Sequence, residues 1–170
     1  MAAELFFYFL VYASLGWILE AGHNRITRGR FRKDGLMLGP VKPMYGLAPV
    51  VLVAAGGTEL PLPWLIVLAL TVPTAVELAS GLMLERWFGR RYWDYSGERY
   101  QWNGQICLKF SMYWWGLSMM ILYFVQPLLE QAYTGLGTVW PLLLPVFAAG
   151  FLADLLWTFQ SKKARRGEAS

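Results

Sequence analysis

Four acidic side chains fall inside or beside apolar stretches of this sequence: Glu20, Glu77, Glu85 and Asp154. An acid at the centre of a membrane helix costs about 2.5–3.5 kcal/mol on insertion scales. Such a residue is therefore expected to face other helices, to pair with a cation or to carry a proton. Lys42 and Lys109 lie at comparable depth and are candidate cations.

Glu77 lies well inside its apolar segment, and Ser80 follows it at the spacing that places two side chains on one helix face. Two interpretations stay open. In the first, Glu77 and Lys109 form a buried ion pair that fixes helix packing. In the second, the acids line a polar pocket that opens to one side of the membrane. Its mouth would then be formed by Glu85, Asp94 and Asn103.

The sequence offers no convincing catalytic or metal-binding set. The single cysteine, Cys107, and the single histidine, His23, exclude a multi-cysteine or multi-histidine metal centre. No nucleophile has an evident base beside it. We therefore expect no enzyme, no metal and no cofactor, although an Asp/Glu pair acting on a lipid stays open as a third choice.

The composition indicates which class of protein contains these residues. The chain has 170 residues, of which 56% are hydrophobic and 15% charged, whereas soluble domains carry about a quarter charged residues. Five apolar segments are predicted as helices: 4–22, 36–57, 63–88, 106–126 and 138–160. The expected fold class is an all-α, polytopic membrane helix bundle of about five spans. Residues 1–160 would form one transmembrane domain and residues 161–170 a basic cytoplasmic tail.

The basic residues predict the orientation. All 15 Lys and Arg fall into three groups, at 25–42, 86–109 and 162–166. Five alternating spans place these groups on one side, and Lys and Arg are retained in the cytoplasm. We therefore expect an outside N-terminus and a cytoplasmic C-terminus. The net charge of +4 needs no nucleic-acid partner and suits contact with anionic membrane lipids.

The second apolar segment is predicted to be broken. Gly39, Pro40 and Pro43 interrupt its beginning, so only about 44–55 reads as continuous helix. About 12 residues rise roughly 18 Å, which is less than the roughly 30 Å hydrocarbon core. The break lies either at the cytoplasmic boundary, where water satisfies the backbone, or inside the protein, where it would help to form a binding site.

Several motifs together resemble a known family. They are "GWILEA" at 16–21, "LGPVKPMYG" at 38–46, "ELASGLMLERWFGRRYWDYS" at 77–96 and "WNGQICLKFSMYWWG" at 102–116. This set resembles the ABC-transporter permease family of small bacterial membrane proteins, the CmpB-like family. The polar positions that match add Glu20, Tyr45 and Ser111 to the predicted pocket.

The resemblance implies a transporter permease subunit of the bacterial inner membrane that handles a small solute through a cytoplasm-facing polar pocket. The chain has no Gly-x-x-x-x-Gly-Lys-Ser/Thr loop, so it would need a separate ATP-binding subunit. Five spans are few for such a unit, which suggests a homodimer. The alternative function is a non-catalytic membrane assembly or interaction protein.

Overall fold

The computed structural model describes residues 1–28, 37 and 39–167. The predicted basic residues Arg30, Arg32 and Lys33 lie outside the described residues. The chain divides into two compact units. Unit 1 contains Met1–Leu47 and Gln131–Ser170, and unit 2 contains Ala48–Glu130.

Helices account for nearly all of the regular structure. They are α1 (Ala2–Arg28), α2 (Pro43–Ala54), α3 (Leu62–Phe88), α4 (Leu108–Met120), α5 (Gln126–Leu136) and α6 (Val139–Gly167), with a 3₁₀ turn at Gly57–Glu59 and a π turn at Ile121–Val125. Two short strands, β1 (Gln101–Trp102) and β2 (Ile106–Cys107), pair antiparallel. Among the described residues, four helical stretches are long and apolar enough to cross a membrane: Ala2–Gly22, Leu62–Phe88, Leu108–Leu136 and Val139–Lys162. The predicted membrane helix bundle is confirmed.

In unit 1, glycines let the start of α2 approach α1 closely. A Cβ atom on Gly16 would lie 2.3 Å from the Tyr45 ring, and one on Gly46 would lie 2.5 Å from the Phe9 carbonyl oxygen. The Lys42 amide also donates a 3.1 Å hydrogen bond to the Ala13 carbonyl oxygen. Small residues allow this kind of backbone approach between membrane helices.

Aromatic contacts join α6 to α1 in the same unit. Phe151 packs edge-on against Phe9, with ring centroids 5.3 Å apart. The indole N–H of Trp140 donates a 2.8 Å hydrogen bond to the Ala3 carbonyl oxygen. Trp140 also contacts the Phe7 ring at 5.1 Å.

The break in the second apolar segment is present. Residues 39–42 are not helical, and α2 begins at Pro43 and ends at Ala54, close to the predicted 44–55. Proline is tolerated at the first position of a helix because the N–H there has no intrahelical acceptor. The resulting helix of 12 residues is apolar but shorter than the four long helices described above.

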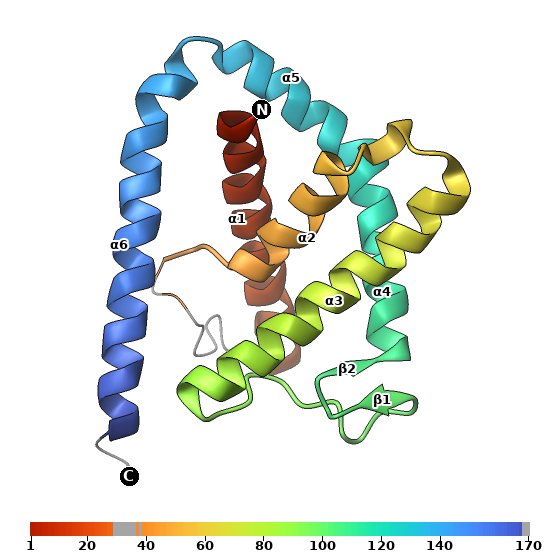
Figure 1. Cartoon of the computed structure of the whole chain (residues 1–170), viewed down its shortest axis with the longest axis vertical. Coiled ribbons are helices and arrows are strands. Elements are labelled where there is room, and N and C mark those ends of the chain that lie inside the picture. Colours follow the sequence, from red (N-terminus) through yellow and green to blue (C-terminus); the bar gives the residue numbers. More distant parts are fainter. Residues whose placement is uncertain (29–36, 38, 168–170) are drawn as a thin grey trace. The chain divides into compact units, whose positions relative to one another are not determined.

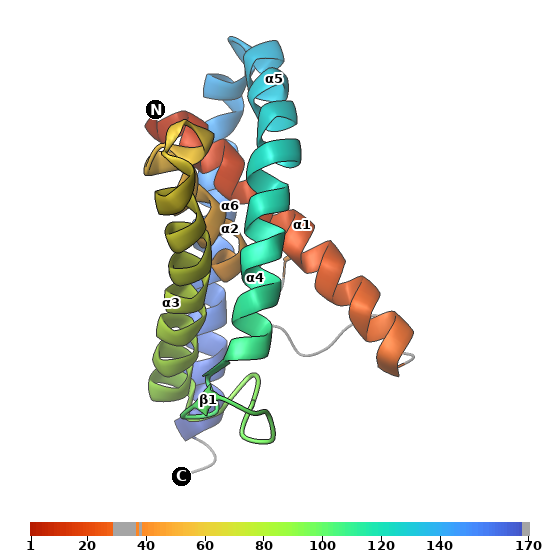
Figure 2. The ribbon, with the colours of Figure 1, turned by 90° about the vertical axis from the view of Figure 1, so that its right-hand side faces the viewer.

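In unit 2, α3 and α4 lie side by side (Figures 1 and 2). The buried residues of α3 recur every three or four positions, which places them on one helix face: Leu65, Ala69, Pro73, Glu77, Gly81, Leu84 and Phe88. At one end of this face, Leu65 packs with Leu52 and Leu122 in an apolar cluster. At the other end α3 stops at Gly89, whose φ of 67° suits a glycine C-cap.

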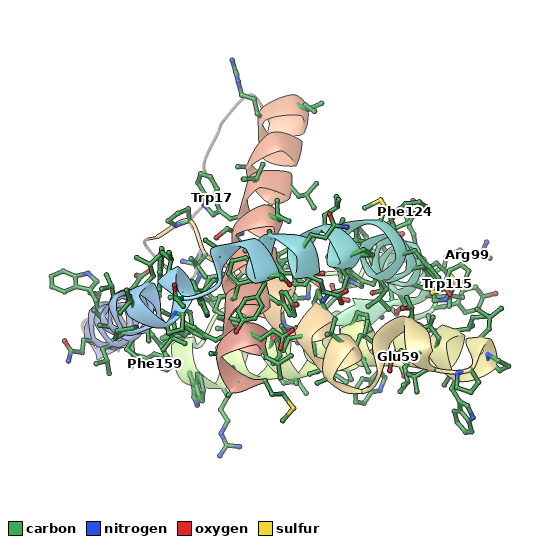
Figure 3. All side chains as sticks on the ribbon, turned by 90° about the horizontal axis from the view of Figure 1, so that it is seen from above. Trp17, Glu59, Arg99, Trp115, Phe124 and Phe159 are labelled. Carbon is green, nitrogen blue, oxygen red and sulfur yellow. The ribbon has the colours of Figure 1, made fainter. Side chains whose placement is uncertain are left out.

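One expected connection is helical instead. Residues 127–137 were predicted to link the fourth and fifth spans, but the helix continues through α5 to Leu136. The π turn at Ile121–Val125 directly precedes Pro127. A proline ring crowds the carbonyl of the preceding α turn, and the wider π turn lets the helix pass this point. Phe124 in this turn is 70% exposed and points outward (Figure 3).

The close approach at Gly46 yields a test. We expect Gly46→Ala to lower the free energy of unfolding by about 1–3 kcal/mol, because the new Cβ would meet backbone that cannot move aside. Gly150→Ala on α6 is the control, since a Cβ there meets nothing within 4 Å. Thermal melting of both variants in detergent measures the difference. Equal melting temperatures would contradict the packing of α1 against α2.

Candidate functional site

The connection between α3 and α4 is folded. We call residues 89–107 the cap; it contains β1 and β2 and lies where α3 ends and α4 begins (Figures 1 and 2). Asn103 and Gly104 turn the chain between the strands with φ of 53° and 67°, as the Asn-Gly pair predicts. A Cβ atom on Gly104 would lie 2.6 Å from an Asp94 carboxylate oxygen, so the loop packs tightly on this turn.

Each residue of the sequence Trp93-Asp94-Tyr95-Ser96 makes a contact that holds the cap. The Trp93 indole donates to the Gln105 carbonyl oxygen at 2.9 Å. The amide of Tyr95 donates to the Gly104 carbonyl oxygen at 2.8 Å. The hydroxyl and amide of Ser96 both donate to Asp94, which holds the pKa of this exposed carboxyl below its usual value. The motif therefore fixes the cap conformation.

Tyr95 also connects the cap to the buried face of α3. Its hydroxyl donates a 2.9 Å hydrogen bond to Glu77 Oε1. Its ring stacks on Phe110 of α4, with centroids 4.5 Å apart. Glu77 is only 2% exposed, and the indole of Trp114 on α4 lies close to its carboxyl. The second oxygen, Glu77 Oε2, accepts no hydrogen bond from the part of the chain that the structure describes.

Two turns along α3 from Glu77, Glu85 binds the cap at two points. Gln105 Nε2 donates to Glu85 Oε2 at 2.7 Å, and Arg91 Nε donates to Glu85 Oε1 at 2.8 Å. Gln105 is 1% exposed and lies directly over Gly81, where a Cβ would approach its Oε1 to 2.1 Å. Gly81 therefore provides the space in which Gln105 reaches Glu85.

Of the two interpretations of Glu77, the one in which it forms an ion pair with Lys109 is wrong. Lys109 Nζ binds Glu98 Oε1 of the cap at 2.9 Å, and its side chain is half exposed. Lys109 lies in the first turn of α4, which begins at Leu108. From there its long side chain reaches the cap and keeps its charge in water, which costs less than burial beside Glu77.

The other predicted site residues fall into two groups. In unit 2, Ser111 is buried, Ser80 is partly buried and Asn103 is exposed at the hairpin turn. Unit 1 contains Glu20 and Tyr45, together with the broken segment Gly39, Pro40 and Pro43. In unit 2, Glu77 and Glu85 each bind residues of the cap, and Asp94 lies in the cap itself.

The polar groups of unit 1 fix the broken segment between α1 and α6. Glu20 forms an ion pair with Lys42. The amide of Gly39 donates a 2.9 Å hydrogen bond to Asp154 Oδ2. A Cβ on Gly39 would lie 2.8 Å from this same oxygen, so the position favours glycine. The neighbouring helices thus provide acceptors for two backbone amides of the segment: the Asp154 carboxylate for Gly39 and the Ala13 carbonyl oxygen for Lys42.

The sequence did not predict Tyr95 as the partner of Glu77, Gln105 and Arg91 as partners of Glu85, or Glu98 as the partner of Lys109. Tyr95 was within the recognised motif, but its distance in sequence from Glu77 gives no signal of a contact. Gln105 follows the Asn-Gly turn, and the turn alone does not show which way it points. Within the described ranges, no three His, Cys, Asp or Glu side chains are grouped to hold a metal ion.

Gly81 provides a test of the cap. We expect Gly81→Ala to displace Gln105 and break its bond to Glu85, with an overpacking cost of about 1–3 kcal/mol. This raises the population of the opened cap at least about fivefold. Trypsin cleavage at the exposed Arg90 and Arg99 measures that population; Arg99 extends outward in Figure 3.

Gly116→Ala on α4 is the matched control, because a Cβ there meets nothing within 4 Å. If both variants are cleaved at the wild-type rate, Gln105 does not depend on the space above Gly81.

Comparison with known proteins agrees with the resemblance in the motifs. The searches of curated proteins and of solved structures returned no match. A family described as "Putative ABC-transporter type IV" matches residues 7–159, which include the cap, both of its anchoring acids and the broken segment. The chain belongs to this family of ABC-transporter-type membrane proteins.

Proposed function

We propose that this protein is the membrane subunit of an ABC-type transporter of the bacterial inner membrane. The observation that carries the proposal is the family match over residues 7–159. The chain has no phosphate-binding loop of the Gly-x-x-x-x-Gly-Lys-Ser/Thr type, so ATP hydrolysis belongs to a separate subunit. Five crossings are few for a complete transport path, which favours a homodimer as the working unit.

The basic residues support an outside N-terminus and a cytoplasmic C-terminus. In the described helices, Arg25 lies near the end of α1, Arg86 in the last turn of α3 and Lys162 near the end of α6. The cap and the start of α4 add Arg90, Arg91, Arg99 and Lys109. With α2 crossing as a short helix, all of these regions meet the cytoplasm and anionic lipid.

We place the solute site near Glu77, at the cytoplasmic end of α3 and α4. A buried ionisable residue in a membrane helix marks a functional site by default. Glu77 has one oxygen bound to Tyr95 and one without a partner in the described chain. A small polar solute that enters beneath the cap would find this free acceptor. Ser111, also buried, lies one turn from Trp114 on α4.

A specific observation favours the assembly function as a second candidate. All four acids in the spans bind groups of this same chain: Glu20 with Lys42, Glu77 with the Tyr95 hydroxyl, Glu85 with Arg91, and Asp154 with the Gly39 amide. Acids used in this way hold loops to helices. A protein that only organises other membrane subunits would need these bonds and no solute route.

The transporter function is tested with an ATPase. The tagged full-length chain is co-expressed with each ABC-type ATP-binding protein of its native host and purified in mild detergent. We expect one ATP-binding protein to co-elute and to hydrolyse ATP faster in the complex than alone. If none binds while the chain remains folded, the transporter proposal fails and the assembly function gains support.

The orientation is tested with reporter fusions. We expect alkaline phosphatase, which is active only outside the cytoplasm, to be inactive when fused after Ser170. The same reporter fused near 137–138, in the connection between α5 and α6, should be active. Activity at the C-terminal fusion would reverse the orientation.

A further inference from the structure

Glu77 is a buried acid that is paired with no cation in the part of the chain that the structure describes. No lysine or arginine forms an ion pair with it among the described side chains. Of the charged groups on the packed elements, Lys109 on α4 binds Glu98, and Arg91 in the cap binds Glu85. Asp94 in the cap is occupied by Ser96. The groups that contact the Glu77 carboxyl are the Tyr95 hydroxyl and the Trp114 indole, which are both neutral.

A carboxylate held in this way must be neutralised by something other than a side chain. Moving an ion out of water is costly unless it is paired or neutralised. Metal cations such as Na⁺ and Ca²⁺ need several oxygen ligands around them. Around Glu77, Tyr95 donates its proton to Oε1, and the indole can only donate. Hydrogen-bond donors stabilise a carboxylate, but they do not ligate a metal cation. The proton is the ligand that fits.

We propose that Glu77 is a proton-binding site, neutral in the closed protein, which exchanges its proton with the cytoplasmic side when the cap opens. Binding forms one O–H bond on the Glu77 carboxyl, with the proton taken from water, and release returns it. The Tyr95 hydrogen bond favours the ionised form, so the cap and the proton act on the same carboxyl in opposite ways. The inference rests on the proposed function in treating Glu77 as a functional residue and in placing the cap on the cytoplasmic side.

The experiment uses dicyclohexylcarbodiimide, an apolar reagent that adds to protonated carboxyl groups in apolar surroundings. The full-length protein is labelled in liposomes over a range of pH and then mapped by mass spectrometry. We expect label on Glu77 that decreases as the pH rises, and loss of that label in Glu77→Gln. Glu59→Gln is the control, because Glu59 is exposed in the 3₁₀ turn between α2 and α3, away from the cap, and its variant should keep the Glu77 label.

Tyr95→Phe separates proton binding from a purely structural role. Without the Tyr95 hydroxyl the carboxylate loses a donor, so the pH at which labelling falls by half should move upward. Its thermal melting shows whether the cap is still folded. Absence of label on Glu77 at every pH in folded protein would overturn the proposal. So would labelling that does not respond to pH, or protection by Na⁺ at constant pH.

These outcomes are independent of the ATPase assay. Labelling of Glu77 without any ATP-binding partner would keep the proton site and reject the transporter. If a functional complex with an ATP-binding protein forms but Glu77 is never labelled, the transporter proposal stands and the proton site is rejected.

Discussion

The hydrogen bond from Tyr95 to Glu77 links a water-exposed loop to the buried face of a membrane helix. It joins residues that are 18 positions apart in the sequence. Through this bond, the middle of the cap is attached to α3. Glu85 and Gln105 bind nearer the end of α3, while Lys109 and Glu98 bind at the start of α4. A cap attached at these points holds the adjoining ends of α3 and α4 at a fixed separation. Any ligand or proton that changes Glu77 therefore also changes how firmly the cap is held.

Unit 1 solves a related problem with the same chemistry. Its non-helical segment carries backbone groups that lipid cannot satisfy. The neighbouring helices provide the partners, through the Ala13 carbonyl and the Asp154 carboxylate. The glycine at position 39 allows Asp154 to approach the backbone. In both units, acids that are costly within a membrane are used as acceptors for chain that is not helical. The free-energy cost of burying these acids is offset by the hydrogen bonds that they accept from the non-helical chain. Regular helix satisfies its own backbone and would not need these bonds.

The sequence was sufficient to predict the apolar helices other than α5, and the broken segment, because span length, proline and glycine act locally. It also identified the acids and the Trp-Asp-Tyr-Ser motif as important. It could not identify their partners, since Glu77 and Tyr95 meet only after the hairpin turns at Asn103. The error on Lys109 has a physical basis: matched depth suggests a pair, but a long side chain at a helix start can reach solvent instead. Helix α5 was missed because proline and glycine usually end helices, and a π turn removed that constraint.

The π turn before Pro127 also sets the rotation of everything that follows it in the helix. Each residue turns an α-helix by about 100°, so one additional residue in a wide turn shifts the faces that come after it by that angle. Gln126, which is buried and bonded to Glu130, lies directly beyond this shift. Loss of one residue between Ile121 and Val125 would leave a regular helix of good length, but it would turn Gln126 toward the lipid. The length of this stretch is thus as constrained as its composition.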